Sequence, residues 1–261
     1  MKYSFSFTVV LLLVLGFTFL LVAWISPSRN LTPAYESPGF AVVELFTSQG
    51  CSSCPPADAL LSDIAQKAEQ QNLPIHVLSF HVDYWNRLGW KDPYSQPDFS
   101  ARQRQYTQTW QNTQMYTPQM TINGNSGFVG SRQQQAWRDI NSTLKQPAHA
   151  SVVLQATTTK EQATVAYQVL GDYQGKDLQI ALVEKHIQTS VRRGENGGKM
   201  LHHTHVVREF SRQSLSSSAQ GKARLRLPPD LQPANALIIA YVQDRANLKI
   251  SGATSVALTN I

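Results

Sequence analysis

The stretch TSQGCSSCPPAD, residues 47–58, contains both cysteines of the 261-residue chain, Cys51 and Cys54. A pair with two residues between its members can form a redox-active disulfide, supply half of a metal site or act as a small structural clip. A bond between the two would close a loop so short that it removes little entropy from the unfolded chain. The spacing therefore favours redox chemistry or metal binding over a structural clip.

The sequence on either side predicts that the pair lies between a buried strand and a helix. FAVVELFT, residues 40–47, is a β-rich apolar run, and PPADALLSDIAQKAEQQ, residues 55–71, repeats apolar residues at helical spacing. Unpaired N–H groups and the helix dipole favour a thiolate at the amino end of a helix. We therefore predict that Cys51 is the exposed attacking thiolate and Cys54 the buried resolving thiol.

Strands and helices continue to alternate after this helix. The pattern predicts strands over residues 74–82, 116–124 and 127–131, and helices around residues 99–110 and over residues 132–146. With the first strand and helix, the order becomes β-α-β-α-β-β-α, which is the order of elements in thioredoxin-like proteins. We therefore expect an α/β thioredoxin-like domain over residues 40–147.

After residue 147 the pattern changes to strands alone. Six strand-like runs are separated by Gly, Pro, Asp and Asn: SVVLQATTT, QATVAYQVLG, DLQIALVEKH, MLHHTHVVREF, KARLRLP and ALIIAYVQD. They predict an all-β antiparallel sandwich-like domain over residues 148–261. His203 and His205 would share one face of a histidine-rich strand. The loop RRGENGGK, residues 192–199, is expected to reach the redox face.

The amino-terminal segment predicts export of the rest of the chain. Residues 3–25 carry no charge and are long enough to cross a bilayer as a helix, which needs about 20 apolar residues. Residues 1–25 therefore form either a cleaved signal peptide or an uncleaved membrane anchor. Residues 26–39, rich in Pro, Ser and Gly, form a linker. We expect a periplasmic protein, or an anchored one facing the periplasm, where disulfides are allowed.

The charge pattern argues against a nucleic-acid partner. The net charge is +6, but the basic residues are scattered and no run of five or more occurs. The sequence contains no recognisable nucleic-acid-binding module. We therefore expect no nucleic acid as partner, and contact with a membrane only through the amino-terminal segment.

Polar residues near the pair are candidates for tuning its chemistry. Glu44, if buried behind the pair, would pass a proton to or from Cys54; otherwise it lies on the surface of an edge strand. In FHVDYWNRLGWKDPY, residues 80–94, His81 would tune the thiolate or bind a metal, and Asp83 would orient His81. Trp85 would contact a bound peptide. The alternative is a packed loop with satisfied polar groups.

Several motifs together resemble one family: VVELFTSQGCSSCPPADALL, FHVDYWNRLGWKDP, ARQRQY, YTPQMTINGN, FVGS and ENGGKMLHHTHVVREF. It is a family of exported bacterial thioredoxin-like proteins catalogued as a domain of unknown function. The resemblance implies functional positions at Cys51, Cys54, Thr117 and Pro118. In thioredoxin-like proteins this proline is cis, faces the cysteine pair and leaves the preceding backbone free for a peptide. The alternative is a trans proline that opens an edge strand.

These observations predict an exported thiol–disulfide oxidoreductase that needs no cofactor. Its partners would be protein or peptide thiols and disulfides of the cell envelope, together with a redox recycling partner. One alternative is a copper-binding metallochaperone that uses Cys51, Cys54 and His81, because soft thiolates favour Cu(I). Another is a non-catalytic binding module in which the β region contacts the partner.

Overall fold

The computed structural model describes residues 37–111 and 114–258. The expected signal peptide or membrane anchor, residues 1–25, lies outside the described residues, as does the linker up to residue 36. Within the described ranges, no helix combines the length and the apolar character that crossing a bilayer requires. The end of the linker is held by a bridge between Ser37 and Ala148.

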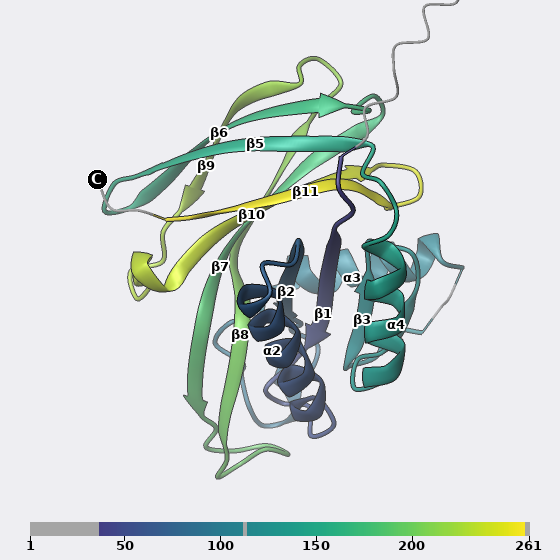
Figure 1. Cartoon of the computed structure of the whole chain (residues 1–261). Helices are drawn as coiled ribbons and strands as arrows, with labels where there is room; N and C mark the ends of the chain where they lie inside the picture. Colours follow the sequence, from purple (N-terminus) through teal and green to yellow (C-terminus); the bar gives the residue numbers. More distant parts are fainter. Residues whose placement is uncertain (1–36, 112–113, 259–261) are drawn as a thin grey trace, which may run out of the picture. The chain divides into compact units, whose positions relative to one another are not determined.

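Strands make up most of the regular secondary structure of the described residues, and they form two sheets (Figure 1). The larger has eight strands, in the spatial order β11 (Ile250–Ala257), β10 (Ala236–Asp244), β7 (Lys176–Ser190), β8 (Met200–Ser214), β2 (Ile75–His81), β1 (Ala41–Thr47), β3 (Gln119–Ile122) and β4 (Gly127–Val129). It is mixed, because β1 runs parallel to β2 and β2 parallel to β8, while the other neighbours are antiparallel. The smaller sheet is antiparallel, with the order β5 (Ala150–Thr158), β6 (Gln162–Gly171) and β9 (Gln220–Arg226).

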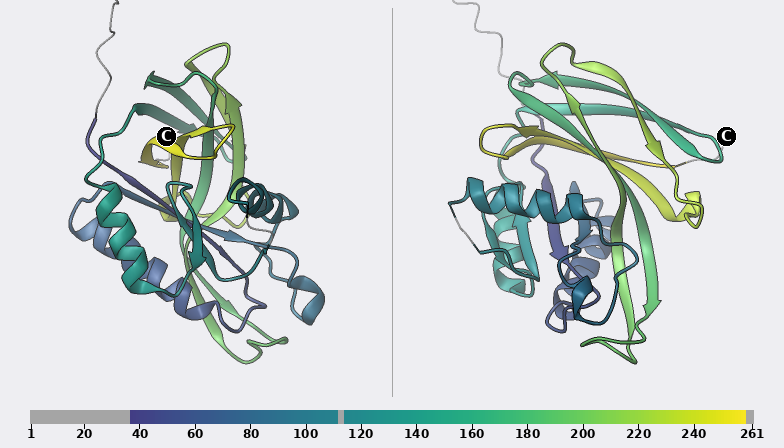
Figure 2. Two further views of the ribbon diagram at one scale, coloured as in Figure 1. Left: turned by 90° about the vertical axis from the view of Figure 1, so that its right-hand side faces the viewer. Right: turned by 180° about the vertical axis from the view of Figure 1, so that it is seen from behind.

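Helices cover both faces of the part of the large sheet that contains β1. The described α-helices are α2 (Pro55–Gln70), α3 (Pro97–Thr109) and α4 (Gln133–Thr143), and short 3-10 turns lie at η2 (Asn86–Leu88) and η3 (Pro233–Asn235). α2 and α4 lie on one face and α3 on the other, as Figure 1 and the rear view of Figure 2 show. Side chains of β1 alternate between these faces, so Val43 and Leu45 contact the α2 side and Phe46 the α3 side. All of β1 is buried as a result.

The expected fold class is wrong. We expected an α/β thioredoxin-like domain followed by a separate all-β antiparallel sandwich-like domain. Instead, β7, β8, β10 and β11 extend the same sheet that contains β1 to β4. The protein is therefore mostly β, with one large mixed sheet rather than an α/β domain and a detached β domain.

Packing on the α3 side explains why the late strands join the early ones. β8 meets β2 at the parallel pair Ser79 and Val206. The aromatic side chains of Phe46 and Phe80 share one apolar cluster with Tyr241, which comes from β10. Burial of aromatic side chains is strongly favourable, so these contacts hold the late strands onto the early ones.

The small sheet packs against the end of the large sheet that lies farthest from β4 in the strand order. Apolar residues of β5, β6 and β9 form a cluster with those of β7 and β10. At one point the two sheets approach so closely that a Cβ on Gly252 of β11 would lie 2.0 Å from the carbonyl oxygen of Ala150 in β5. Glycine is required at this crossing because any side chain would collide with the backbone of the other sheet.

Candidate functional site

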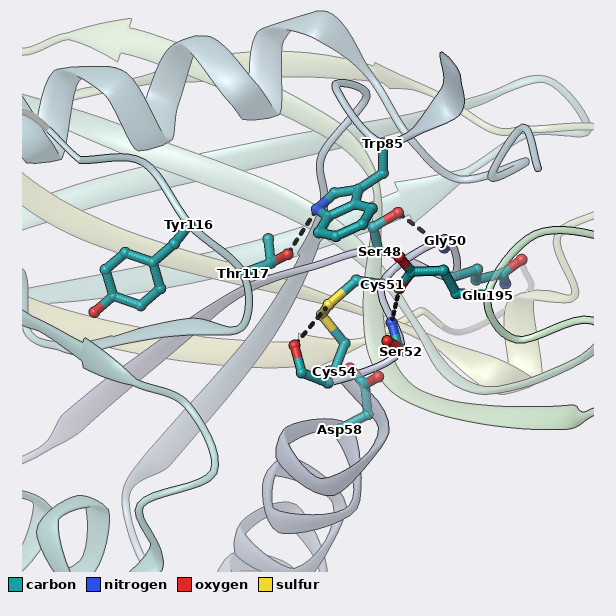
Figure 3. The surroundings of a disulfide bond; sticks show 12 residues. Ser48, Gly50, Cys51, Ser52, Cys54, Asp58, Trp85, Tyr116, Thr117 and Glu195 are labelled. Carbon is teal, nitrogen blue, oxygen red and sulfur yellow. Dashed lines mark hydrogen bonds between the residues drawn. A yellow bond between two sulfur atoms is a disulfide. The ribbon is translucent and has the colours of Figure 1, made fainter. Parts of the chain in front are cut away.

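Cys51 and Cys54 form a disulfide where the chain passes from β1 into α2 (Figure 3). Their Cα atoms are 5.4 Å apart, and Cys54 is the N-cap residue of the helix. The amide of Cys54 donates to the carbonyl of Cys51 at 3.2 Å, and the amide of Ala57 donates to the carbonyl of Cys54 at 2.8 Å. The pair thus lies at a helix amino end, where N–H groups favour an anionic sulfur.

The cysteines are less accessible than the sequence suggested. Both side chains are 0% exposed, whereas the two intervening serines, Ser52 and Ser53, are exposed. The expectation of an exposed Cys51 is therefore wrong for the disulfide form. The Ser53 hydroxyl lies 3.4 Å from the sulfur of Cys51, where it could donate to a thiolate.

The loop between β7 and β8 covers the cysteine loop. The side-chain amide of Asn196 donates to the carbonyls of Gln49 and Cys51 at 3.0 and 2.9 Å. Glu195 accepts a hydrogen bond from the amide of Ser52 at 3.0 Å, and hydrogen bonds from Ser52 lower the pKa of this carboxyl. The loop over residues 192–199 therefore reaches the cysteine loop, as the sequence predicted.

Trp85 and Thr117 lie together beside the disulfide (Figure 3). The indole N–H of Trp85 donates to the hydroxyl of Thr117 at 2.7 Å. The Thr117–Pro118 peptide bond is cis, which confirms that expectation. A Cβ on Gly130 would lie 3.2 Å from the Cβ of Pro118 and 3.1 Å from that of Ala57, so glycine lets β4 approach the start of α2. Among the described residues, none bonds to the backbone N–H or carbonyl of Thr117.

Gln49 connects the covering loop to the segment after β2, and sequence reasoning missed it. Its amide donates to Asp92 at 2.8 Å, and its side-chain oxygen accepts from the indole of Trp90 at 3.0 Å. Its side-chain amide donates to Thr189 at 3.0 Å. Gln49 is fully buried, so each of these bonds satisfies a group that water does not reach. No spacing rule in the sequence marks such a residue.

His81 is fully buried and pairs with Asp92, not with Asp83. Nδ1 of His81 lies 2.7 Å from a carboxylate oxygen of Asp92. Burial lowers the pKa of His81, but the charge of Asp92 and its hydrogen bond outweigh this, so the pKa of His81 is raised above 6.5. Asp83 instead accepts a hydrogen bond from Ser100 of α3. The expected role of Asp83 in orienting His81 is therefore wrong.

A second buried pair, His203 and Asp58, lies next to His81. The rings of His81 and His203 make a T-shaped contact with centroids 4.7 Å apart. Nδ1 of His203 lies 3.7 Å from a carboxylate oxygen of Asp58, one turn into α2 from Cys54. Sequence reasoning assigned no role to Asp58, although the four-residue spacing from Cys54 places the two on one side of the helix. The same reasoning noted His203 only as part of a histidine-rich strand.

Glu44 is buried, but it lies away from the disulfide. Arg102 of α3 donates to Glu44 through two nitrogens, at 2.9 and 2.7 Å. Tyr241 donates to the same oxygen at 2.8 Å, and Tyr106 donates to the other. Glu44 thus faces α3, whereas the disulfide begins α2 on the opposite face of the sheet. This arrangement makes Glu44 part of a structural ion pair that joins α3 to β10.

The copper alternative with Cys51, Cys54 and His81 stays a prediction. In the part of the chain that the structure describes, no three His, Cys, Asp or Glu side chains converge as metal ligands. His205 is used elsewhere, because its Nδ1 lies 3.1 Å from the carbonyl of Val77 in β2. Burial lowers the pKa of His205 to about 4, so this ring is neutral at pH 7.

One solved structure has the same fold over most of this chain. The crystal structure of protein AGR_C_4864 from Agrobacterium tumefaciens is 24% identical and covers 87% of this chain and 98% of that chain, with a TM-score of 0.65. A domain of the outer membrane lipoprotein Omp28 from Porphyromonas gingivalis is 16% identical and covers 43% of this chain and 90% of that chain, with a TM-score of 0.29.

Comparison with protein families identifies the chain at the level of its family. Among curated proteins, none matches this chain. Residues 42–243 match the family model described as protein of unknown function (DUF1223). This range includes the cysteine pair, the cis proline and both buried histidines of the site. The match confirms the resemblance to a family of unknown function, and the chain belongs to that family.

Proposed function

We propose that the chain is an exported thiol–disulfide oxidoreductase that acts on proteins or peptides of the cell envelope. The observation that carries the proposal is the Cys51–Cys54 disulfide at the start of α2, beside Trp85 and Thr117. A disulfide that closes so short a loop contributes little stability, so its position at a helix amino end is better explained by exchange chemistry.

The exchange runs through two steps. In the reduced protein, the thiolate of Cys51 attacks one sulfur of a substrate disulfide, and the other substrate sulfur leaves as a thiolate. Cys54 then attacks the Cys51 sulfur, the Cys51–Cys54 disulfide forms, and the second substrate thiolate leaves. The reverse sequence oxidises a substrate dithiol. A separate redox partner returns the cysteine pair to its starting state.

Burial of the disulfide requires that the covering loop moves before a substrate sulfur reaches Cys51. The contact between Glu195 and Ser52 is exposed to solvent, where hydrogen bonds compete with water. The unpaired backbone of Thr117 then supplies a donor and an acceptor for an extended peptide. Trp85, held by Thr117, provides an aromatic surface for the side chains of that peptide.

Equilibration with glutathione tests the proposal. The full-length protein is incubated in buffers spanning roughly −120 to −270 mV, and its free thiols are counted by alkylation and mass spectrometry. We expect one reversible two-electron transition within this range. Metal content is measured on the same reduced samples, because stoichiometric copper retained only by the reduced form would favour the metallochaperone instead.

Variants of the same loop provide the controls. Cys51→Ala and Cys54→Ala lack the transition, whereas Ser52→Ala retains it because Ser52 contributes no sulfur. A pair that stays fully oxidised at the reducing end of this range, near roughly −270 mV, behaves as a structural disulfide, and this result would contradict the proposal.

A further inference from the structure

Asp58 is a buried carboxylate on the same side of α2 as Cys54. Its amide donates to the carbonyl of Cys54 at 3.1 Å, and residues four apart on a helix have neighbouring side chains. Figure 3 places the carboxyl group directly beside Cys54, below the disulfide. Asp58 is 5% exposed, and within the described residues its Oδ1 atom has no hydrogen-bond partner. An acceptor left unpaired in this position is what the thiol of a reduced Cys54 would need.

His203 lies next to this carboxylate. Nδ1 of His203 lies 3.7 Å from Oδ2 of Asp58, and His203 is 3% exposed. Neither ring nitrogen of His203 has a hydrogen-bond partner among the residues described. The position suits a histidine that accepts or returns a proton as the charge of the carboxylate changes.

The other charged groups around Asp58 come from three further elements. His81 of β2 contacts the ring of His203, and Asp92, in the segment after β2, pairs with His81. Asp58 also lines an open groove of about 330 Å³ between α2 and β8, with Asp63 and His202 on its walls. A proton that reaches Asp58 therefore has a route to solvent through this groove.

We propose that Asp58 is the proton acceptor for Cys54 during thiol–disulfide exchange, and that His203 is its positioning residue. This proposal rests on the oxidoreductase function proposed above. In the resolving step, the Cys54 thiol gives its proton to Oδ1 of Asp58. The resulting thiolate attacks the sulfur of Cys51, the bond between Cys51 and the substrate sulfur breaks, and the substrate leaves as a thiolate. The proton then leaves Asp58 for solvent, and in the reverse reaction Asp58 returns one to Cys54.

The test follows the resolving step by itself. Reduced full-length protein is mixed with the symmetrical disulfide of 2-nitro-5-thiobenzoate. Attack by Cys51 releases one coloured thiolate and leaves the other half of the reagent in a mixed disulfide, and attack by Cys54 then releases that half as a second coloured thiolate, whose phase reports the resolving step. The release rate is recorded from about pH 5 to pH 9 in wild type and Asp58→Asn. We expect Asp58→Asn to be slower by roughly 100-fold near pH 6, because a positioned base typically contributes 10² to 10⁴. The two rates converge near pH 9, where hydroxide removes the proton.

Two further variants separate a proton role from a structural one. Glu69→Gln removes a carboxylate from the exposed side of the same helix, outside the groove beside Asp58, and leaves the profile unchanged. His203→Gln shifts the pH at which the rate of the resolving step levels off, because it removes a titratable ring next to Asp58. Identical pH profiles for wild type and Asp58→Asn would overturn the proposal.

The pH profile of the wild type alone also tests the role of Asp58, even if Asp58→Asn does not fold. A wild-type rate that rises tenfold with each pH unit across the whole range is the profile of an unassisted thiol, and it contradicts the role of Asp58. A wild type that releases no coloured thiolate and fails to equilibrate with glutathione instead contradicts the oxidoreductase function. The two failures are therefore distinguishable.

Discussion

At the scale of single residues, the site depends on buried polar groups held by specific hydrogen-bond partners. Asp92 is the clearest example, because one of its carboxylate oxygens accepts from both His81 and the amide of Gln49. Its other oxygen accepts from the amide of Tyr94 at 3.0 Å. Burial raises the pKa of Asp92, but the charge and hydrogen bonds of these partners outweigh burial and lower the pKa below 3.8. Asp92 therefore stays ionised throughout the neutral range and favours the charged form of His81.

Asp92→Asn is expected to destabilise the protein in a pH-dependent way. Removal of one partner of a buried ion pair typically costs about 3–5 kcal/mol. The raised pKa of His81 stabilises the folded state fully below pH 6.5, and this stabilisation is lost as pH rises through the folded pKa. The stability difference between wild type and variant is therefore larger near about pH 5.5 than near about pH 8.5. Urea unfolding at both values measures it, with Asp83→Asn as the control that leaves His81 paired.

The sequence located some residues of the site and misjudged the partners of others. Trp85 and Thr117 were predicted beside the cysteines, and they meet there. The partner of His81 was misassigned because the segment after β2 folds back, and Asp92 returns to His81 from 11 residues away. Such a pairing depends on the path of a loop, which side-chain periodicity does not encode.

At the scale of elements, the β7–β8 loop is hydrogen-bonded to the cysteine loop, and we expect it to control access to the disulfide. Asn196 is fully buried and satisfies two carbonyls of the cysteine loop. Without its amide, both carbonyls need water, which enters only when the loop separates from the cysteine loop. The closed arrangement is therefore held mainly by this side chain.

Asn196→Ala is expected to expose Cys51. Two hydrogen bonds of about 0.5–1.5 kcal/mol each correspond to roughly a 5- to 150-fold increase in the open population. The rate at which iodoacetamide labels Cys51 in the reduced protein measures this change. Glu195→Ala, which removes an exposed contact, should have a smaller effect. Equal labelling rates in wild type and Asn196→Ala would mean that another element provides the cover.

The network around Glu44 joins elements from distant parts of the sequence. Arg102 of α3 contacts Glu44 of β1 and the hydroxyl of Tyr241 in β10. The charge of Glu44 outweighs burial and raises the pKa of Arg102. Arg102 is therefore always charged, and it needs a charged partner within the core.

Glu44→Gln is expected to reduce stability without changing the chemistry of the cysteines. The variant leaves a buried guanidinium without its counter-charge, at a cost of about 3–5 kcal/mol. Denaturant unfolding measures the loss, with Glu69→Gln on the exposed side of α2 as the matched control. The pH profile of the resolving step should match that of wild type. A changed pH profile would instead support the hypothesis that Glu44 relays a proton to Cys54.

At the scale of the whole described region, local structure was easier to predict than the pairing of strands. The helix expected over residues 55–71 is α2, and the strand expected over residues 40–47 contains β1. β11 was missed because ISGATSVA lacks an apolar run and is buried mainly where it crosses β5. Strand periodicity reports which face is buried, not which strand is the neighbour. The pairing of β2 with β8 could therefore not be predicted from the sequence.

A fragment that ends at residue 147 is expected not to fold independently. It would expose Phe46 and Phe80, which pack against Tyr241 in the intact protein, and it would leave the β2 edge without β8. Unpaired edges and exposed aromatic clusters favour aggregation or a loosely packed state. Near-ultraviolet circular dichroism and dye binding of the fragment, compared with the full chain, measure this. A cooperative unfolding transition in the fragment would show that residues up to 147 form a domain of their own.

The covering loop comes much later in the sequence than the cysteines, so it is synthesised after them. Asn196 follows Cys51 by 145 residues, so the cysteines leave the ribosome well before their cover exists. At 5–20 residues per second, this interval lasts roughly 7 to 29 s. During that time both thiols face their surroundings, and any oxidant present meets them unprotected. The finished fold then closes over whichever redox state the nascent chain has acquired.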